Sequence, residues 1–396
     1  MPEPRRPRIY LDWNATTPLR PEARAAMAAA WDVIGNPSSV HTEGRAARAL
    51  VEGARAAVAR SLGAEPRGVI FTSGGTEANV LALAPGLRGP AAPPVARLLV
   101  SAVEHASVLA GGRFRPEDIT RVAVTPDGVV DLDDLRRRLA DGPPALVSVL
   151  HANNETGAIQ PITEIAELVR AAGGLLHVDA IQALGRIACR LPELGADLVS
   201  VSAHKVGGPK GVGALVLRDG LVPAEPLIRG GGQEQNRRGG TENVPGIAAF
   251  GAAVDAAMAG REHEAGRQGR LRGAMEAGLM EHPGTVVFSS HVQRLPNTTL
   301  VSAPGLRAET TVIAFDLEGI AVSSGSACSS GKVAPSHVLA AMQVPADLAQ
   351  GAIRLSMGWD TTESGIARLL EAWRKITGVL GRGVIRTAPG TVLKKG

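Results

Sequence analysis

Short apolar runs alternate with longer amphipathic stretches along most of this chain. The clearest amphipathic stretch is Pro161–Ala172, where apolar residues recur at helical spacing until Gly173 and Gly174 end the pattern. The apolar runs predict six strands, at Gly68–Thr72, Arg97–Ala102, Ala145–Leu150, Leu175–Val178, Asp197–Val201 and Gly213–Arg218. Strands that alternate with helices predict an α/β fold, with a mostly parallel sheet that carries helices on both faces.

The pattern changes in the last third of the chain. Ala248–Met280 is rich in Ala, Glu and Arg, and it predicts one long helix that leads to a smaller α+β region. The runs in that region predict a final helix near Thr362–Thr377 and three strands, at Thr298–Val301, Thr311–Leu317 and Ile353–Ser356. We therefore expect a large domain at residues 16–255 and a small domain made of residues 1–15 and 256–396.

Composition and charge narrow the classes of function. The chain has 396 residues, 44% of them hydrophobic, which is ample for a large core. Its net charge of +4 is spread along the sequence, and one Tyr and five Phe offer few surfaces for base stacking, so we expect no direct nucleic-acid binding. No apolar run approaches the roughly 20 residues that span a bilayer. No signal peptide precedes Tyr10, and we expect a cytoplasmic protein that makes no membrane contact.

The two cysteines, Cys189 and Cys328, have different surroundings. Two cysteines cannot form a disulfide framework, which agrees with a reducing compartment. Cys328 lies in the small, polar stretch Ser323–Gly331, whereas structural cysteines are usually buried among apolar neighbours. Cys189 has no such polar setting, and we interpret it as structural.

Lys205 stands at the end of a predicted strand, in a Ser-Ala-His-Lys sequence that a glycine-rich turn follows. Lysine is rare in this chain, with six lysines among the 42 basic residues. A desolvated lysine amine can be neutral and can form a Schiff base, which a guanidinium cannot do. An ordinary surface lysine is the alternative that the local sequence leaves open.

Polar residues also follow the other predicted strands, and open parallel sheets bind ligands beyond these carboxyl ends. Thr72–Asn79 could hold a phosphate at a helix N-terminus, or could be an ordinary helix cap. His105 could stack on a flat ring or move protons, or could be structural. Asn153 and Asn154 offer amide donors and acceptors, or form a turn. Asp179 needs a cationic partner if buried, either a protonated pyridine nitrogen or an arginine of the protein.

Taken together, these strand ends supply a phosphate cradle, an acid for a ring nitrogen and an amine on the neighbouring strand. These are the parts that hold pyridoxal phosphate, in which a lysine forms the Schiff base and an acid pairs with the pyridinium. The sequence therefore predicts pyridoxal 5'-phosphate as the cofactor.

The same residues resemble those of the cysteine desulfurases, in the class V aminotransferase group of fold-type I pyridoxal-phosphate enzymes. The resemblance runs almost end to end. Its motifs follow the family's order and occur at Tyr10–Pro18, Gly35–His41, Thr72–Asn79, Val103–His105, Asn153–Gly157, His177–Gln182, Ser202–Gly211, Arg229–Glu234, Arg237–Asn243, Ser323–Ser330 and Ile353–Ser356. The fold implied is α/β, with a mostly parallel mixed sheet flanked by helices in the large domain and a smaller α+β domain.

The resemblance also implies roles around the cofactor. Lys205 would form the Schiff base, Asp179 would pair with the pyridine nitrogen, and Gln182 would contact the ring hydroxyl. His105 would stack on the ring and act as acid or base. Thr241 would reach the phosphate of the neighbouring subunit, which implies a homodimer. The phosphate would otherwise be held by Gly75, Thr76, Ser202 and His204.

Toward the substrate, the resemblance implies that Asn14, Asn154 and Arg354 bind L-cysteine, with Arg354 gripping its carboxylate in a bidentate pair. Cys328 would take up the sulfur as a persulfide while L-alanine is released. The Cys328 stretch is similar to that of the group serving nitrogenase and general iron–sulfur cluster assembly. A protein sulfur acceptor is therefore the expected partner, either a cluster scaffold, a transfer RNA thiolation protein or a shuttle, and no metal site is expected.

Two other classes of function stay open from the sequence. One keeps the cofactor but changes the reaction, to that of a selenocysteine lyase or an aminotransferase, and Cys328 speaks against simple transamination because that reaction needs no thiol. The other is a catalytically silent scaffold for cluster-assembly proteins, and the intact set of Lys205, Asp179, His105 and Cys328 speaks against it.

The chain departs from the family pattern at two places. Gly75 stands where many relatives carry Ala, a change that we expect to be harmless. Gln235 follows Glu234 where a Gly is frequent, which leaves the local turn open.

Overall fold

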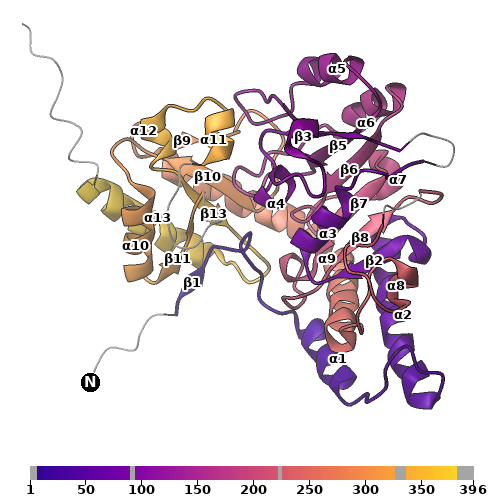
Figure 1. Ribbon diagram of the computed structural model, residues 1–396. Coiled ribbons are helices and arrows are strands. Elements are labelled where there is room, and N and C mark those ends of the chain that lie inside the picture. The colour runs from indigo at the N-terminus through magenta and orange to yellow at the C-terminus, as the bar shows by residue number, and fades with distance from the viewer. Residues whose placement is uncertain (1–6, 90–93, 222–224, 326–335, 381–396) are drawn as a thin grey trace, which may run out of the picture.

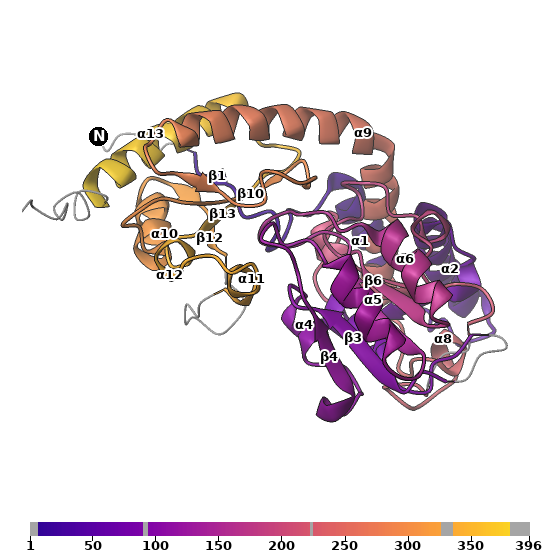
Figure 2. The same ribbon diagram turned by 90° about the horizontal axis from the view of Figure 1, so that it is seen from above.

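The computed structural model describes residues 7–89, 94–221, 225–325 and 336–380. Figure 1 shows a large region around one sheet and a smaller region beside it. Helix α9 (Val244–Met280) begins in the large region and extends along the smaller one, as the view in Figure 2 shows. Within the described ranges, every helix falls short of the length and hydrophobicity that crossing a lipid bilayer requires.

The large sheet has seven strands in the order β2-β8-β7-β6-β5-β3-β4. Five of them, β7, β6, β5, β3 and β4, run parallel, while β8 is antiparallel to both β7 and β2. The strands are β2 (Val69–Thr72), β3 (Arg97–Ser101), β4 (Ile119–Val122), β5 (Ala145–Leu150), β6 (Leu175–Asp179), β7 (Leu198–Ser202) and β8 (Gly213–Leu217). This mixed, mostly parallel sheet confirms the predicted α/β fold.

Side chains of the large sheet alternate between two helix-covered cores. In β8, Ala214 and Val216 belong to one core, whereas Leu215 and Leu217 belong to the other. The first core is covered by α9 together with α1 (Pro21–Trp31), α2 (Thr42–Leu62), α5 (Leu132–Ala140), α6 (Ile162–Ala171) and α7 (Leu191–Leu194). The second core is covered by α3 (Gly75–Ala82) and α4 (Ala106–Leu109). Helices therefore lie on both faces, as the alternating pattern predicts.

The smaller region has its own sheets and core. An antiparallel sheet has the order β12-β13-β10-β9, and a parallel pair joins β1 (Ile9–Tyr10) to β11 (Ile320–Ala321). The N-terminal segment thus lies in this region, and Leu11 is buried in the same core as Phe315 and Trp373. The remaining elements are β9 (Val286–Val287), β10 (Thr298–Ser302), β12 (Ser323–Ser324), β13 (Ile353–Ser356), α10 (Ala308–Leu317), α11 (His337–Ala341), α12 (Ala346–Ala349) and α13 (Glu363–Leu380).

The predicted strand at Thr311–Leu317 is wrong, because these residues form the second part of helix α10. Thr311 and Phe315, four residues apart, are both buried, whereas Ile313 between them is 61% exposed. A strand with one buried face would have buried all three, since its side chains alternate with a period of two. The run therefore follows the helical period of 3.6 residues.

The predicted helices differ from the observed ones mainly at their ends. Helix α6 begins at Ile162, so Pro161 is its N-cap and not its first helical residue. Helix α9 begins at Val244, earlier than predicted, because the Asn243 side chain accepts a hydrogen bond from the Gly246 N–H and caps it. The expected domain division at residue 255 falls inside this continuous helix and stays a prediction.

The turn after Glu234 adopts a left-handed backbone without any glycine. Glu234, Gln235 and Asn236 have φ values of 48°, 57° and 64°. Arg55 donates to both carboxylate oxygens of Glu234 at 2.7 and 2.9 Å, and the Phe71 N–H donates to one of them at 3.0 Å. Both partners of this ion pair are buried. The pair holds the turn that the sequence left open.

Candidate active site

A cavity of about 290 Å³ lies beyond the carboxyl ends of the parallel strands. Its walls come from the ends of β5, β6 and β7, the start of α3, the N-terminal segment and strand β13. It is lined by Asn14, Ala15, Gly75, Thr76, His105, Ser107, Leu150, Ala152, Asn154, Asp179, Ile181, Gln182, Ser202, His204, Lys205 and Arg354. Among the described residues, the structure thus brings together every predicted site residue except Thr241.

Asp179 ends strand β6, and its carboxylate is held by two donors. The Asn79 amide donates to Oδ2 at 2.8 Å, and the Ile181 N–H donates to Oδ1 at 3.0 Å. Burial raises the pKa of Asp179, and these two hydrogen bonds oppose that rise. Within the described ranges Asp179 forms no ion pair with an arginine, which was one of the two predicted partners. The positive charges of His105 and Lys205 also lower the pKa of Asp179.

His105 is linked to Asp179 through two residues that the sequence reasoning missed. Its Nδ1 lies 2.8 Å from Ser107 Oγ, and Ser107 Oγ lies 2.9 Å from the amide nitrogen of Asn79. Burial lowers the pKa of His105, and the nearby Asp179 carboxylate opposes this. Asn79 lies one turn after Thr76 on helix α3, and this i, i+3 spacing is the signal that could have indicated it.

Lys205 closes a short 3₁₀ turn, Ala203–Lys205, directly after strand β7. Its Nζ donates to the backbone carbonyls of Asn14 at 2.5 Å and Ala15 at 2.8 Å. Gln182 Nε2 donates to the same Asn14 carbonyl at 3.0 Å. The amine is therefore partly buried in the cavity wall, and Lys205 is not an ordinary surface lysine.

The end of the cavity next to helix α3 offers hydrogen-bond donors, and a ligand can come close to the backbone there. Gly75 and Thr76 begin this helix, where N–H groups lack intrahelical partners. Ser202 Oγ is buried and has no hydrogen-bond partner among the described residues. Burial lowers the pKa of His204 to about 4. A Cβ on Gly75 would lie 2.3 Å from the Ile181 Cδ1 atom, so the side chain of Ile181 fills the space that an alanine would need.

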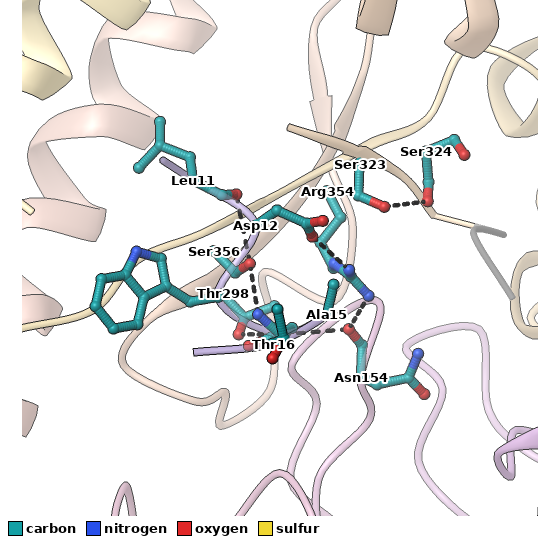
Figure 3. A network of polar contacts seen from close by, with 12 residues as sticks. Leu11, Asp12, Ala15, Thr16, Asn154, Thr298, Ser323, Ser324, Arg354 and Ser356 are labelled. Atoms are coloured by element: carbon teal, nitrogen blue, oxygen red, sulfur yellow. Dashed lines mark hydrogen bonds and ion pairs between the residues drawn. The ribbon is translucent and has the colours of Figure 1, made fainter. Parts of the chain in front are cut away.

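Arg354 enters the cavity from strand β13 and is held at two nitrogens. Its Nη2 lies 2.8 Å from Asp12 Oδ1, and its Nη1 donates to the Asn154 carbonyl at 3.0 Å, as Figure 3 shows. The Nε atom is buried without a hydrogen-bond partner among the described residues. The Asn14 side chain donates to the Asn154 carbonyl at 3.2 Å and to Thr298 Oγ1 at 2.9 Å. Asn14 therefore connects the cavity wall at Asn154 to the smaller region.

Thr241 and Cys189 lie away from the cavity. Thr241 is exposed and does not line the cavity. Cys328 lies outside the described residues. Cys189 is 1% exposed in the large core, and burial raises its pKa to about 12, which agrees with a structural role. The part of the chain that the structure describes contains no group of three or more His, Cys, Asp or Glu residues arranged to hold a metal ion.

Glu155 is a further residue that the sequence reasoning missed. It is 4% exposed, and Ser336 Oγ donates to its Oε2 at 2.6 Å. A Cβ on Gly325 would lie 3.1 Å from the same oxygen. Burial raises the pKa of Glu155 to about 7, and Ser336 and Arg354 oppose the rise. Gly325 and Ser336 are the described residues on either side of residues 326–335, which include Cys328. The Glu155 carboxyl is therefore close to both of these flanking residues.

Comparison with known proteins decides the family. The family described as aminotransferase class-V matches residues 9–369. The chain belongs to the class-V aminotransferases. Within this family it is 47% identical to a cysteine desulfurase from Cereibacter sphaeroides, over 92% of this chain and 94% of that protein. It is 41% identical to the cysteine desulfurase IscS from Dictyoglomus turgidum, over 93% and 94% of the two chains.

Solved structures agree with this assignment. An X-ray structure of a NifS-like protein from Rickettsia africae ESF-5 superposes with a TM-score of 0.85 at 35% identity, covering 94% of this chain and all of that one. A cysteine desulfurase from Thermococcus onnurineus NA1, at 22% identity and a TM-score of 0.79, shares the fold. This class-V aminotransferase is thus an enzyme with cysteine desulfurase activity that depends on pyridoxal phosphate, as the sequence predicts.

The cavity of this class-V aminotransferase fits that cofactor. The Asp179 carboxylate has no arginine partner within the described residues and suits a protonated ring nitrogen. The unpaired Ser202 hydroxyl and the Gly75 backbone suit a phosphate. The Lys205 amine lies in the wall of the same cavity.

Proposed function

We propose that the described cavity is where this enzyme converts L-cysteine to L-alanine, and that the sulfur leaves on Cys328 as a persulfide. The observation that carries the proposal is the gathering of an amine, a buried acid, an anion cradle and an arginine in one cavity from distant parts of the chain. Each of these groups answers one chemical need of the reaction. No other cavity described in this structure combines them.

Around the cofactor, we assign Lys205 as the residue that holds it covalently and Asp179 as the partner of its ring nitrogen. Gln182 contacts the ring hydroxyl. Its amide orientation supports this role, because Arg186 donates to Oε1 and Nε2 donates to the Asn14 carbonyl. The amide nitrogen is therefore the donor that Gln182 presents. When bound, the cofactor supplies an electron sink for the substrate's bonds.

The phosphate is held at the start of α3 by Gly75 and Thr76, with Ser202 and His204 beside them. Ser202 contributes a hydroxyl that has no other partner among the described residues. His204 is kept neutral, since burial lowers its pKa to about 4, and can donate from one ring nitrogen.

L-cysteine is oriented by Arg354 and Asn154. The guanidinium has five N–H donors, and the two bonds to Asp12 and the Asn154 carbonyl occupy one each on Nη2 and Nη1. Enough donors remain for a bidentate grip on the substrate carboxylate. The side chain of Asn14 is already bound to Asn154, Thr298 and Asn297, so we assign it to holding Asn154 in place.

Sulfur transfer needs a nucleophile, and we assign that role to Cys328. Its thiolate attacks the substrate sulfur, an S–S bond forms, and the carbon–sulfur bond breaks with its electron pair going to the carbon side. Protonation of that carbon completes L-alanine. The persulfide then passes to a protein acceptor. The relatives named IscS and NifS-like favour a scaffold or shuttle of iron–sulfur cluster assembly as that acceptor.

We also propose that the enzyme is a homodimer in which Thr241 completes the phosphate site of the partner. Thr241 is exposed and lies outside its own cavity, as this role requires. Large apolar side chains are exposed at the end of α1, in the connection between α1 and α2, and before α8 (Gln233–Asn236). They are Trp31, Ile34, Val40, Leu227 and Ile228, with exposed fractions from 38% to 89%. Burial of such surface in a dimer is favourable.

The test of the catalytic assignment combines a spectrum with product analysis. The purified enzyme should be yellow, and L-cysteine should give sulfide and alanine. Cys328→Ala should keep the colour and lose sulfide release, while Cys189→Ala should keep both. Sulfide release by Cys328→Ala would remove Cys328 from the proposal. A Lys205→Ala protein that binds the cofactor without the Schiff-base absorbance band would support the assignment of the amine.

The dimer has a separate test. Light scattering should give twice the mass of one 40.8 kDa chain. Ile34→Glu with Val40→Glu should separate the protomers and weaken cofactor binding, whereas Leu317→Glu, at an apolar position 82% exposed on α10, should leave the dimer intact. A monomeric protein that binds cofactor with full affinity would contradict the dimer.

A further inference from the structure

His105 caps the N-terminus of helix α4 with its own ring. The backbone N–H of Ser107 donates to His105 Nδ1 at 3.2 Å. A backbone N–H can only donate, so Nδ1 must present its lone pair at this contact. In a neutral imidazole the proton then resides on the other ring nitrogen, Nε2.

A second, independent set of contacts fixes the direction of the Ser107 hydroxyl. The Asn79 amide nitrogen lies 2.8 Å from Asp179 Oδ2 and 2.9 Å from Ser107 Oγ. An amide nitrogen has only hydrogens to offer, so Ser107 Oγ accepts from Asn79. The hydroxyl hydrogen is left for His105 Nδ1, which lies 2.8 Å away. The Ser107 N–H and the Ser107 hydroxyl therefore both require a lone pair on His105 Nδ1.

The orientation of the Asn79 amide is itself determined by Asp179. An ionised carboxylate accepts hydrogen bonds and donates none, so it must face the NH₂ group of Asn79 and not the oxygen. Asn79 Oδ1 is buried and has no hydrogen-bond partner among the described residues, which shows that the NH₂ contacts decide the orientation. Asn79 is 0% exposed, Asp179 5% and Ser107 9%. Little water can reach these groups to reverse the chain of donors.

We propose that Asn79 and Ser107 are positioning residues that hold His105 as a neutral imidazole with its proton on Nε2. The inference rests on the proposed role of Asp179, and it narrows the acid or base role that the resemblance implies for His105. His105 then acts toward the bound ring or substrate as a hydrogen-bond donor, and it cannot take up a proton at Nε2. Proton removal from the substrate is left to the Lys205 amine.

The charges that face His105 are compatible with a neutral ring. Burial lowers the pKa of His105, and the positive charge of Lys205 and of His337, when protonated, lowers it further. Asp179 raises it, and the Asp179 carboxylate is engaged by Asn79 and by the Ile181 N–H.

The direct test is the tautomer of His105, measured by long-range ¹H–¹⁵N correlation on protein with ¹⁵N-labelled histidine. The full chain is examined both with and without cofactor at pH 7, and the His105 signals are assigned with His105→Gln. We expect the pattern of a neutral ring protonated at Nε2 in both samples. A ring protonated at Nδ1, or an imidazolium at pH 7, would overturn the proposal.

Variants separate a positioning role from a merely structural one. Ser107→Ala removes one donor to Nδ1 and should raise the pKa of His105 by about half to one unit, because the lost hydrogen bond favours the neutral ring. Ser107→Thr keeps the hydroxyl and should restore the original titration. Ser101→Ala is the matched control, since the Ser101 hydroxyl is buried and accepts from the Val103 N–H without contacting His105. An unchanged His105 titration in folded Ser107→Ala would refute the role of Ser107.

Asn79→Ala supplies the test for the other positioning residue. It leaves the Ser107 hydroxyl without its fixed donor, so both hydroxyl directions become available and the titration of His105 should shift as in Ser107→Ala. The readout does not require turnover of cysteine. If the tautomer is Nδ1-protonated while sulfide and alanine are still produced, only this inference fails. If the tautomer is as expected but no sulfide appears, the proposed function fails instead.

Discussion

Asp12 and Arg354, 342 residues apart in the sequence, form an ion pair where Arg354 lines the cavity, with Asp12 Oδ1 2.8 Å from Arg354 Nη2. Arg354 is 4% exposed, so its orientation depends on these buried contacts and not on solvent. The Asn154 carbonyl holds the neighbouring nitrogen at 3.0 Å. The guanidinium is thus fixed before any carboxylate arrives.

This pair predicts how two substitutions at Asp12 differ. Asp12→Asn keeps an oxygen that can accept from Arg354, whereas Asp12→Ala removes it. A hydrogen bond to a charged group contributes about 1.5 kcal/mol or more, so KM for L-cysteine should be about 10-fold higher in Asp12→Ala than in Asp12→Asn. Steady-state kinetics measures the ratio. Asp219→Ala, which breaks the exposed pair with Arg67, is the control and should leave KM unchanged. Equal KM values in the two Asp12 variants would contradict the positioning role.

Glu155 predicts a pH dependence of stability. Its pKa in the folded protein, about 7, lies above the ordinary value of 4.5, so between these values the folded state keeps a proton that the unfolded state has released. Stability therefore falls as pH rises through this window, and the cost is complete above pH 7. Glu155→Gln has no such cost. The variant should gain stability relative to the native protein by up to about 3 kcal/mol more at pH 8 than at pH 4.5.

Urea unfolding at the two pH values measures this difference. Other groups that titrate in the same range contribute equally to both proteins and cancel. A stability difference that is the same at pH 8 and pH 4.5 would show that folding does not raise the pKa of Glu155.

The turn at Glu234 predicts opposite effects for glycine at two adjacent positions. Gln235 is exposed with φ of 57°, and a left-handed conformation costs a residue with a Cβ roughly 1–2 kcal/mol. Gln235→Gly should therefore stabilise the protein by about 0.5–1 kcal/mol after the larger entropy of unfolded glycine is subtracted. Glu234→Gly relieves the same strain but leaves the buried Arg55 with the exposed Glu52 as its remaining carboxylate partner, and should destabilise by about 3 kcal/mol. Thermal unfolding distinguishes the two signs.

Gly75 and Ile181 predict a compensating pair of substitutions. Gly75→Ala places a Cβ 2.3 Å from Ile181 Cδ1, so the isoleucine must move and cofactor affinity should fall. Ile181→Val removes Cδ1, and the double variant should recover most of the affinity of the native enzyme. Titration with pyridoxal phosphate, followed by absorbance, gives the three dissociation constants. Additive effects of the two substitutions would mean that the contact does not limit binding.

The part of the site at the strand ends could be predicted from the sequence. Asp179, Ser202 and Lys205 each follow an apolar run, and parallel strands bring such ends to one edge of the sheet. Asn79 and Ser107 could not be assigned in this way. They lie on two different helices, and their contact with each other depends on how these helices pack against the sheet.

Most strands of the large sheet could also be predicted from the sequence. The strands of the large sheet are buried apolar runs and were found within one or two residues, except β4, whose first three residues are only partly buried or exposed. The strand predicted at Thr311–Leu317 was wrong because a short apolar run fits both a strand and a helix until its buried face is known. The two-residue strands β1, β9, β11 and β12 carry too few residues to show any period.

The placement of the N-terminal segment has a consequence for synthesis on the ribosome. Asp12 and Asn14 are made before the seven-stranded sheet, yet their partners Thr298 and Arg354 are made after it. Domains tend to fold as they emerge, so the sheet can form while the segment that holds Asp12 and Asn14 still lacks these partners. The contacts that fix the Arg354 guanidinium can form only after strand β13 has emerged, so the complete cavity is a late product of synthesis.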